Sequence, residues 1–283
     1  MNEPPERLRV VFADLRRAID DVILKHQVTL DELLGAADWL RQVADADELP
    51  SASILFFKTV QRGTAGASYA HPEKDGASHW EMEGPAHRPG APVLRSPAVL
   101  PMRPDEPGEP LVVSGIVRTT TGDLLPGAAL EIWQIDANDV YSGLTAADFA
   151  PLDIPNDATG VPADNLRARI IADDRGHYEF RTVMPGVETF GLATQSPLAT
   201  LTRALKLDGR RPRHIHAIVS AAGCLPLTTQ IYFDGDPLVE STIEGAVPAE
   251  AVKTTTLRED HGARGLAGPY RALTYDFVLR PGT

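Results

Sequence analysis

Two histidines separated by a single residue are the part of this sequence best suited to chemistry. His214 and His216 begin a stretch in which Ile215 to Val219 favours a β-strand. Side chains at positions i and i+2 of a strand leave from the same face, so the imidazoles should stand about 6.5 Å apart at Cα. Two imidazoles placed in this way can bind one metal ion, although such pairs also occur on solvated strands.

A tyrosine far upstream extends this pair to a candidate set of three ligands. Residues 130–140 form another predicted strand, and Tyr141 follows it directly. A tyrosinate and two histidines suit ferric iron, because the high charge of the ion favours the phenolate over the phenol. A lone tyrosine at the end of a strand is more often a core residue, so this prediction requires the three side chains to converge.

Five ordered motifs between Leu111 and Asp236 resemble one protein family. In chain order they are Gly115-Ile-Val with Leu125-Pro-Gly-Ala, Glu131-Ile-Trp-Gln with Tyr141-Ser, Gly176-His-Tyr-Glu-Phe-Arg-Thr-Val, Arg211-Pro-Arg-His-Ile-His, and Thr228-Thr-Gln-Ile-Tyr-Phe-Asp-Gly-Asp. Together they resemble the intradiol ring-cleavage dioxygenases. These are non-haem ferric iron enzymes that include the catechol 1,2-dioxygenases and the hydroxyquinol 1,2-dioxygenases.

The resemblance implies a role for each matching residue. Tyr141, His214 and His216 match protein ligands of Fe(3+). Arg211 matches an arginine that stabilises negative charge on the substrate ring, and Gln230 matches a glutamine that supports the site from behind the ligands. The implied reaction uses O2 to cleave a small aromatic diol to a cis,cis-muconate-type dicarboxylate.

The sequence departs from the family at the second tyrosine ligand. Alignment of residues 182–197 puts Phe190 where that tyrosinate is expected, and no tyrosine lies between Tyr178 and Tyr232. Because phenylalanine cannot bind iron, we expect one fewer fixed negative charge at the site and a lower iron affinity. Phe190 is then a candidate substrate-facing residue.

Two further segments correspond to walls of the substrate pocket in the family. Pro85 and Ala86 lie in a Gly-Pro turn that matches one wall, and Ile243 and Glu244 match another. The family usually has bulkier apolar or aromatic residues in both segments. The small side chain of Ala86 and the charge of Glu244 therefore predict a substrate larger or more polar than catechol.

Composition excludes several classes of partner. The formal net charge of −12 argues against nucleic acid and anionic membranes, since both require a basic face. No apolar run is long enough to span a bilayer, and a single cysteine excludes an intramolecular disulfide. The N-terminal residues lack the basic start and apolar core of a secretion signal, so a cytoplasmic location is expected.

The chain is predicted to have three parts. Residues 1–62 should be helical, with helices over 7–25, 29–44 and 53–62. In the family this region forms the homodimer interface, often with bound lipid, and the same is expected here by resemblance. Residues 63–109 are expected to be a linker that wraps the next domain.

The third part, residues 110–283, is predicted to be the catalytic domain. Turn residues separate about seven short strands, which is enough for a mainly β fold with two packed antiparallel sheets. The predicted strands cover residues 112–117, 129–134, 168–171, 177–183, 214–219, 228–233 and 273–279.

Two alternatives to a catechol-cleaving enzyme remain open. Phe190 motivates the first, a diverged iron enzyme that acts on an unusual or larger substrate in a biosynthetic pathway. The second is a catalytically silent β-sandwich binding protein. Metal analysis separates the binding protein from the two enzymes, and oxygen uptake with a panel of catechols separates the enzymes from each other.

Overall fold

The computed structural model describes residues 6–49, 52, 76–149, 154–189, 196–207, 209–240 and 247–282. The chain forms two compact units, Met1–Leu49 and Pro50–Thr283. The predicted helix over 53–62 lies outside the described residues. No helix in the described ranges has the length and apolar content needed to cross a bilayer.

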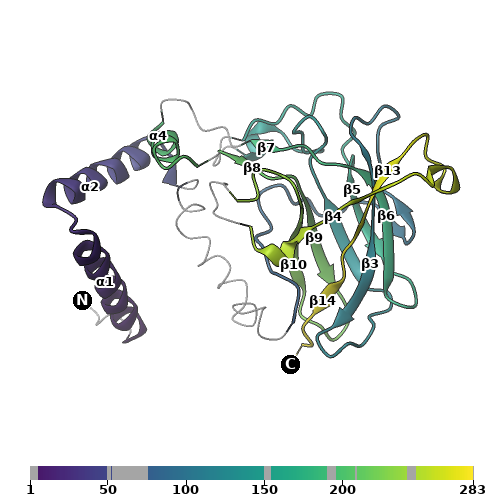
Figure 1. Cartoon of the computed structure of the whole chain (residues 1–283), viewed down its shortest axis with the longest axis horizontal. Coiled ribbons are helices and arrows are strands. Elements are labelled where there is room, and N and C mark those ends of the chain that lie inside the picture. The colour runs from purple at the N-terminus through teal and green to yellow at the C-terminus, as the bar shows by residue number, and fades with distance from the viewer. Residues whose placement is uncertain are drawn as a thin grey trace. The chain divides into compact units, whose positions relative to one another are not determined.

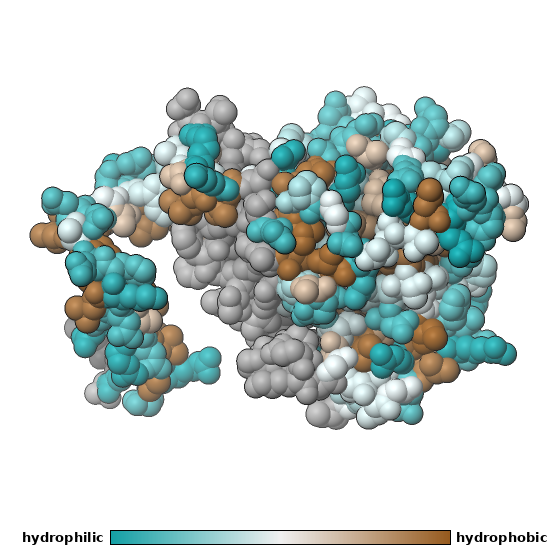
Figure 2. Space-filling model, viewed as in Figure 1, coloured by the Kyte–Doolittle hydropathy of each residue, from teal (hydrophilic) through white to brown (hydrophobic). Residues whose placement is uncertain are grey.

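The first unit contains helices α1 (Glu6–His26) and α2 (Leu30–Asp45), coloured purple in Figure 1. Thr29 and Glu32 form the capping box at the start of α2, since each side chain bonds the backbone N–H of the other residue. α1 buries none of its residues. Figure 2 shows hydrophobic residues on the surface of these helices. On α1, the large apolar side chains that are about half exposed or more include Leu8, Val11, Phe12, Leu15, Ile19 and Val22.

The second unit is built mainly of strands in two large sheets (Figure 1). The first sheet runs in the order β1 (Val93–Arg95), β5 (Arg167–Ile171), β4 (Ala129–Trp133), β9 (His214–Ser220), β10 (Leu227–Phe233) and β11 (Val252–Lys253). The second runs in the order β12 (Thr256–Arg258), β13 (Tyr270–Thr274), β3 (Pro110–Thr119), β6 (His177–Val183) and β2 (Ala98–Val99), with β14 (Phe277–Leu279) also paired to β3.

Smaller elements complete the unit. They are a two-stranded sheet of β7 (Glu188–Thr189) and β8 (Arg210–Arg211), helix α4 (Pro197–Ala204), and the 3-10 helices η3 (Ala146–Phe149), η4 (Ala249–Ala251) and η5 (His261–Arg264). The short β7–β8 ladder matters for the site, because it pairs Glu188 directly with Arg211.

The predicted mainly β sandwich with N-terminal helices is confirmed. The central pairs β3–β6, β4–β5, β4–β9 and β9–β10 are antiparallel, as predicted. Other strands add parallel pairs, including β1 on β5 and β2 on β6. Those two strands belong to the predicted linker, which therefore joins both sheets. The main core contains side chains from both sheets, including Leu130, Ile132, Ile215, Val113 and Phe180.

The single strand predicted over 273–279 was wrong, since the structure has β13 and β14 with a break at Tyr275 and Asp276. At the break, the Asp276 carboxylate accepts the Ile116 N–H at 3.0 Å and replaces a ladder bond. The Tyr275 carbonyl passes so close to Gly115 that a Cβ there would lie 1.9 Å from the oxygen. Only glycine permits this approach, and the pairing with β3 is interrupted at the same place, between Thr274 and Phe277.

Candidate metal centre

Strand β9 presents two different buried faces. Ile215, Ala217 and Val219 enter the core between the sheets, where each is fully buried. His214 and His216 lie on the opposite face and are each only 1% exposed. The period-two alternation of a strand thus separates the packing residues from the histidine pair, as the sequence predicted.

The strands on either side of β9 fix the surroundings of His216. Trp133 of β4 and Gln230 of β10 both lie directly across from His216 in the sheet. The Trp133 indole stacks on the His216 imidazole, with ring centroids 4.7 Å apart and ring planes at 7°. A rigid aromatic surface therefore determines the plane of this imidazole.

The three predicted ligands converge. Tyr141 Oη lies 3.1 Å from His216 Nε2, which lies 3.0 Å from His214 Nε2. Tyr141 comes from the loop after β4, and Asn156 holds its backbone at both ends, accepting from the Tyr141 N–H at 2.7 Å and donating to its carbonyl at 3.0 Å. Tyr141 is only 1% exposed, so the three donor atoms lie close together away from bulk water.

Hydrogen bonding sets the tautomer of one histidine. Nδ1 of His214 donates to the Pro212 carbonyl at 2.7 Å, because a carbonyl can only accept. Nε2 of the neutral ring therefore keeps its lone pair and accepts from Nη1 of Arg211 at 2.9 Å. Nδ1 of His216 has no hydrogen-bond partner among the described residues.

Burial and local charge act on both kinds of ligand. Burial lowers the pKa of His216 well below its ordinary value, and neighbouring His214 and Arg211 add to the effect. Burial raises the pKa of Tyr141 well above its ordinary value, and the negative charge of Glu188 raises it further. The imidazole is thus neutral and ready to bind a metal, whereas the phenol must lose its proton when a cation binds.

The donor spacing fits a single cation. Two donors bound at about 2.1 Å to one ion lie about 3.0 Å apart at a 90° angle and about 3.6 Å apart at 120°. The contacts of 3.0 and 3.1 Å between the three donors match this geometry. Within the described ranges no three His, Cys, Asp or Glu side chains form a metal site as they stand, so in this conformation the set of three donors includes the Tyr141 oxygen.

Arg211 and Gln230 lie beside the ligands as expected. Nη2 of Arg211 donates to Oε1 of Gln230 at 2.8 Å, and the Tyr232 hydroxyl donates to the same oxygen at 2.5 Å. The amide nitrogen of Gln230 donates to the Met82 carbonyl at 3.0 Å. Gln230 therefore ties Arg211 to β10 and to the segment before the Gly-Pro turn.

The candidate pocket residues are only partly covered by the structure. Ala86 is buried and its carbonyl accepts from Nη1 of Arg167 at 2.7 Å, whereas Pro85 is exposed. Their turn lies against the site, since a Cβ on Gly84 would be 3.6 Å from His216 Cε1. The remaining candidates, Phe190, Ile243 and Glu244, lie outside the described residues.

Sequence reasoning missed three residues that shape this centre. Trp133 belongs to one of the five motifs but was given no role, although its indole stacks on the His216 imidazole. Arg167 is 1% exposed and donates to the carbonyls of both Ala86 and Ser142. Glu188 is 3% exposed and contacts Arg211. Arg167 and Glu188 lie outside the predicted strands, and the sequence carries no signal of what either charge contacts.

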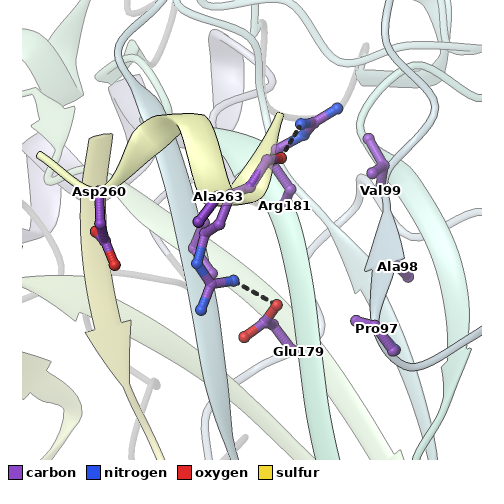
Figure 3. Close-up of a pocket in the computed structure, with 9 residues that line it drawn as sticks. Pro97, Ala98, Val99, Glu179, Arg181, Asp260 and Ala263 are labelled. Carbon is purple, nitrogen blue, oxygen red and sulfur yellow. Dashed lines mark hydrogen bonds and ion pairs between the residues drawn. The ribbon is translucent and has the colours of Figure 1, made fainter. Parts of the chain in front are cut away.

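A surface hollow of about 530 Å³ lies elsewhere, over β2, β6 and η5 (Figure 3). Its lining includes Arg264, which donates to Glu179 at 2.5 Å, and Arg181, which donates to the Arg264 carbonyl at 3.4 Å. These residues belong to the second sheet and to η5, whereas His214 and His216 belong to the first sheet. The hollow is therefore not part of the candidate centre.

Comparison with known proteins gives matches over most of the chain. Residues 82–281 match a family described as dioxygenase. A chlorocatechol 1,2-dioxygenase of Rhodococcus opacus is 31% identical over 251 residues, which cover 87% of this chain and 89% of the relative. A catechol 1,2-dioxygenase of Acinetobacter baylyi is 32% identical over 279 residues, which cover 95% and 82%. The crystal structure of a chlorocatechol 1,2-dioxygenase from Pseudomonas putida is similar with a TM-score of 0.75 and 26% identity, covering 98% of this chain and 100% of that one.

Proposed function

This chain belongs to the intradiol ring-cleavage dioxygenases, and from that premise we propose that it is a ferric-iron enzyme that uses O2 to cleave a catechol-type ring to a cis,cis-muconate-type dicarboxylate. The observation that carries the proposal is the buried run of Tyr141 Oη, His216 Nε2 and His214 Nε2, with contacts of 3.1 and 3.0 Å. Two neutral imidazoles and one phenolate suit a hard, highly charged cation.

Tyr141, His214 and His216 would hold the iron. When bound, ferric iron would supply Lewis acidity toward the two oxygens of a vicinal diol. The protein contributes order and exclusion of water, because Trp133 fixes the plane of His216 and the Pro212 carbonyl fixes the tautomer of His214. Preorganised donors avoid the cost of rearrangement when substrate arrives.

Arg211 is proposed to stabilise negative charge on the substrate ring. Its guanidinium lies 2.9 Å from His214 Nε2 and is 6% exposed, so its charge acts close to the ligands with little screening by water. Glu188 and Gln230 hold it from two directions, at 2.5 and 2.8 Å. A fixed cation at this place favours an anionic ring over a neutral one.

Iron measurement combined with visible spectroscopy tests this function. Protein expressed with sufficient iron should contain one iron per chain and show a phenolate-to-iron absorption that changes when catechol is added. It should also consume O2 with at least one catechol and release a dicarboxylate. Protein without bound iron would instead be a binding protein, and an iron-loaded protein that is inactive on every catechol would indicate a diverged reaction.

The substrate is proposed to be a substituted catechol. The relatives are named for catechol and chlorocatechol, and the small side chain of Ala86 and the charge of Glu244 predict a wider or more polar pocket. Comparing kcat/KM for catechol, chlorocatechols and hydroxyquinol tests this prediction. A preference for plain catechol over every substituted ring contradicts it.

The remaining assignments are also proposals. We propose that residues 1–62 join two chains in a homodimer that can hold lipid, that residues 63–109 form a linker, and that residues 110–283 form the catalytic domain of a cytoplasmic protein. The apolar side chains exposed on α1 support a partner for this helix. Light scattering should then give a particle of twice the 30.5 kDa chain mass, and a monomer at micromolar concentration would contradict the dimer.

A further inference from the structure

Glu188 is a buried carboxylate at the centre of the candidate site. It lies on β7 directly opposite Arg211 of β8, and its residue is 3% exposed. Its Oε2 lies 2.5 Å from Nη1 of Arg211 and 3.7 Å from Nε2 of His214. The carboxylate also lies close enough to the phenol of Tyr141 to interact with it. Glu188 thus contacts the arginine and approaches two of the three proposed iron ligands.

An ion pair with Arg211 alone does not explain this arrangement. Burying two charges costs several kcal/mol per ion, and a buried pair is often no more stable than apolar residues of similar size. Arg211 already has a neutral acceptor in Gln230 at 2.8 Å. The carboxylate also approaches the proposed ligand side chains Tyr141 and His214, where an anion has a clear use only if a second cation, besides Arg211, binds there.

The distances allow Glu188 to share that cation. Its 3.7 Å separation from His214 Nε2 is close to the value of about 3.6 Å for two donors at 120° around one ion. A carboxylate has two oxygens with about four lone-pair sites, so it can accept from Arg211 and bind a metal at the same time. As the side chains stand, Oε2 is directed to Arg211, and the metal-bound state requires the carboxylate to turn toward the histidine pair.

We propose that Glu188 is a fourth protein ligand of the iron, which makes the centre a set of one tyrosine, one glutamate and two histidines. This proposal rests on the proposed iron-dependent function. It supplies a second anionic ligand at a site where the sequence, with Phe190 in place of a tyrosine, predicted only one. The iron affinity should then be higher than the loss of a tyrosinate implies.

Glu188→Gln tests the proposal because glutamine keeps the size of the side chain and one acceptor oxygen for Arg211 but removes the charge. We expect the iron dissociation constant, measured by chelator competition at pH 7, to rise at least about 10-fold. The phenolate-to-iron absorption should persist but move to longer wavelength, since a cation with one fewer anionic ligand is a stronger Lewis acid. An unchanged dissociation constant together with an unchanged absorption maximum would overturn the proposal.

Glu179→Gln is the matched control, since it also removes a carboxylate paired with an arginine, Arg264, but on the second sheet (Figure 3). It should leave iron affinity and colour unchanged, and an equal loss in both variants would overturn the proposal.

A crystal structure of the iron-loaded wild-type protein gives an answer that does not depend on how a variant folds. A Glu188 oxygen at about 2.2 Å from iron supports the proposal, and one beyond hydrogen-bond distance rejects it. If the wild-type protein binds no iron at all, the proposed function itself fails.

Discussion

The indole of Trp133 lies parallel to the imidazole of His216, with 4.7 Å between ring centroids and 7° between ring planes. The two residues face each other across β4 and β9. His216 Nδ1 has no hydrogen-bond partner within the described part of the chain, whereas His214 Nδ1 donates to Pro212. Stacking therefore orients His216, and a backbone hydrogen bond orients His214.

Replacing the indole should loosen His216. We expect Trp133→Leu to lower iron affinity about 10-fold, as loss of a group that orients a ligand usually does, and to lower the free energy of unfolding by about 3 kcal/mol. Chelator competition and urea unfolding of the metal-free protein measure the two effects. Trp80→Leu, which alters the main core, should lower only the stability of the metal-free protein.

Tyr141→Phe should abolish the phenolate-to-iron colour and the activity together, because the Tyr141 hydroxyl oxygen lies 3.1 Å from His216 Nε2 and is the proposed phenolate ligand. The control is Tyr178→Phe. Tyr178 is also fully buried, but its hydroxyl donates to the Tyr275 carbonyl at 2.5 Å, away from the ligands. Full colour in Tyr141→Phe, or loss of colour in Tyr178→Phe, contradicts the ligand assignment.

The placement of His214 beside His216 could be predicted because it follows from a local rule. An i, i+2 pair in a strand faces one side of the sheet whatever the rest of the fold does, and Ile215, Ala217 and Val219 mark the other side as core. The convergence of Tyr141 with this pair came from the family resemblance. The order and approximate limits of the central strands followed from alternation and turn residues.

Glu188 and the broken C-terminal strand depend on contacts that no local pattern records. Glu188 occupies a two-residue strand that pairs with the equally short β8, so periodicity has nothing to detect. At the break, the Tyr275 carbonyl lies against Gly115, far away in sequence, at a distance that only glycine permits. Short strands such as β1 and β2 likewise form because the sheets supply a partner.

Alkaline pH should destabilise the fold through Tyr178. Burial raises the pKa of this phenol well above its ordinary value, with further contributions from Tyr275 and Asp276. Above about pH 10 the unfolded chain releases this proton while the folded protein keeps it, so the free energy of unfolding falls by about 1.4 kcal/mol per pH unit for this group. Below that pH the group contributes no slope.

Tyr178→Phe isolates this effect. The variant should be less stable by about 1 kcal/mol at neutral pH, because the hydrogen bond to the Tyr275 carbonyl is lost. Between pH 10 and 11 its stability should fall less steeply than that of the wild-type protein. Urea unfolding at intervals across this range measures both slopes, and parallel slopes would show that the Tyr178 proton is not retained.

Arg167 should hold together the loops that surround Tyr141. Its Nε donates to the Ser142 carbonyl at 3.0 Å, its Nη1 donates to the Ala86 carbonyl at 2.7 Å, and its guanidinium lies 5.8 Å from the centre of the Tyr141 ring. Burial lowers the pKa of Arg167 to about 10, so the side chain remains charged at neutral pH. Arg167→Met keeps most of the volume but leaves two buried carbonyls without this donor.

We expect Arg167→Met to cost about 2–3 kcal/mol of stability, since unsatisfied buried acceptors cost about 1–3 kcal/mol each and the loops can relax in part. Iron affinity should fall as well, because Ser142 adjoins Tyr141 and Ala86 adjoins the turn against His216. Arg169→Met is the matched control on the same face of β5. Its half-exposed ion pair with Glu131 should contribute at most about 1 kcal/mol and should not affect iron binding. Equal effects of the two substitutions on chelator competition would mean that Arg167 does not position the ligand loop.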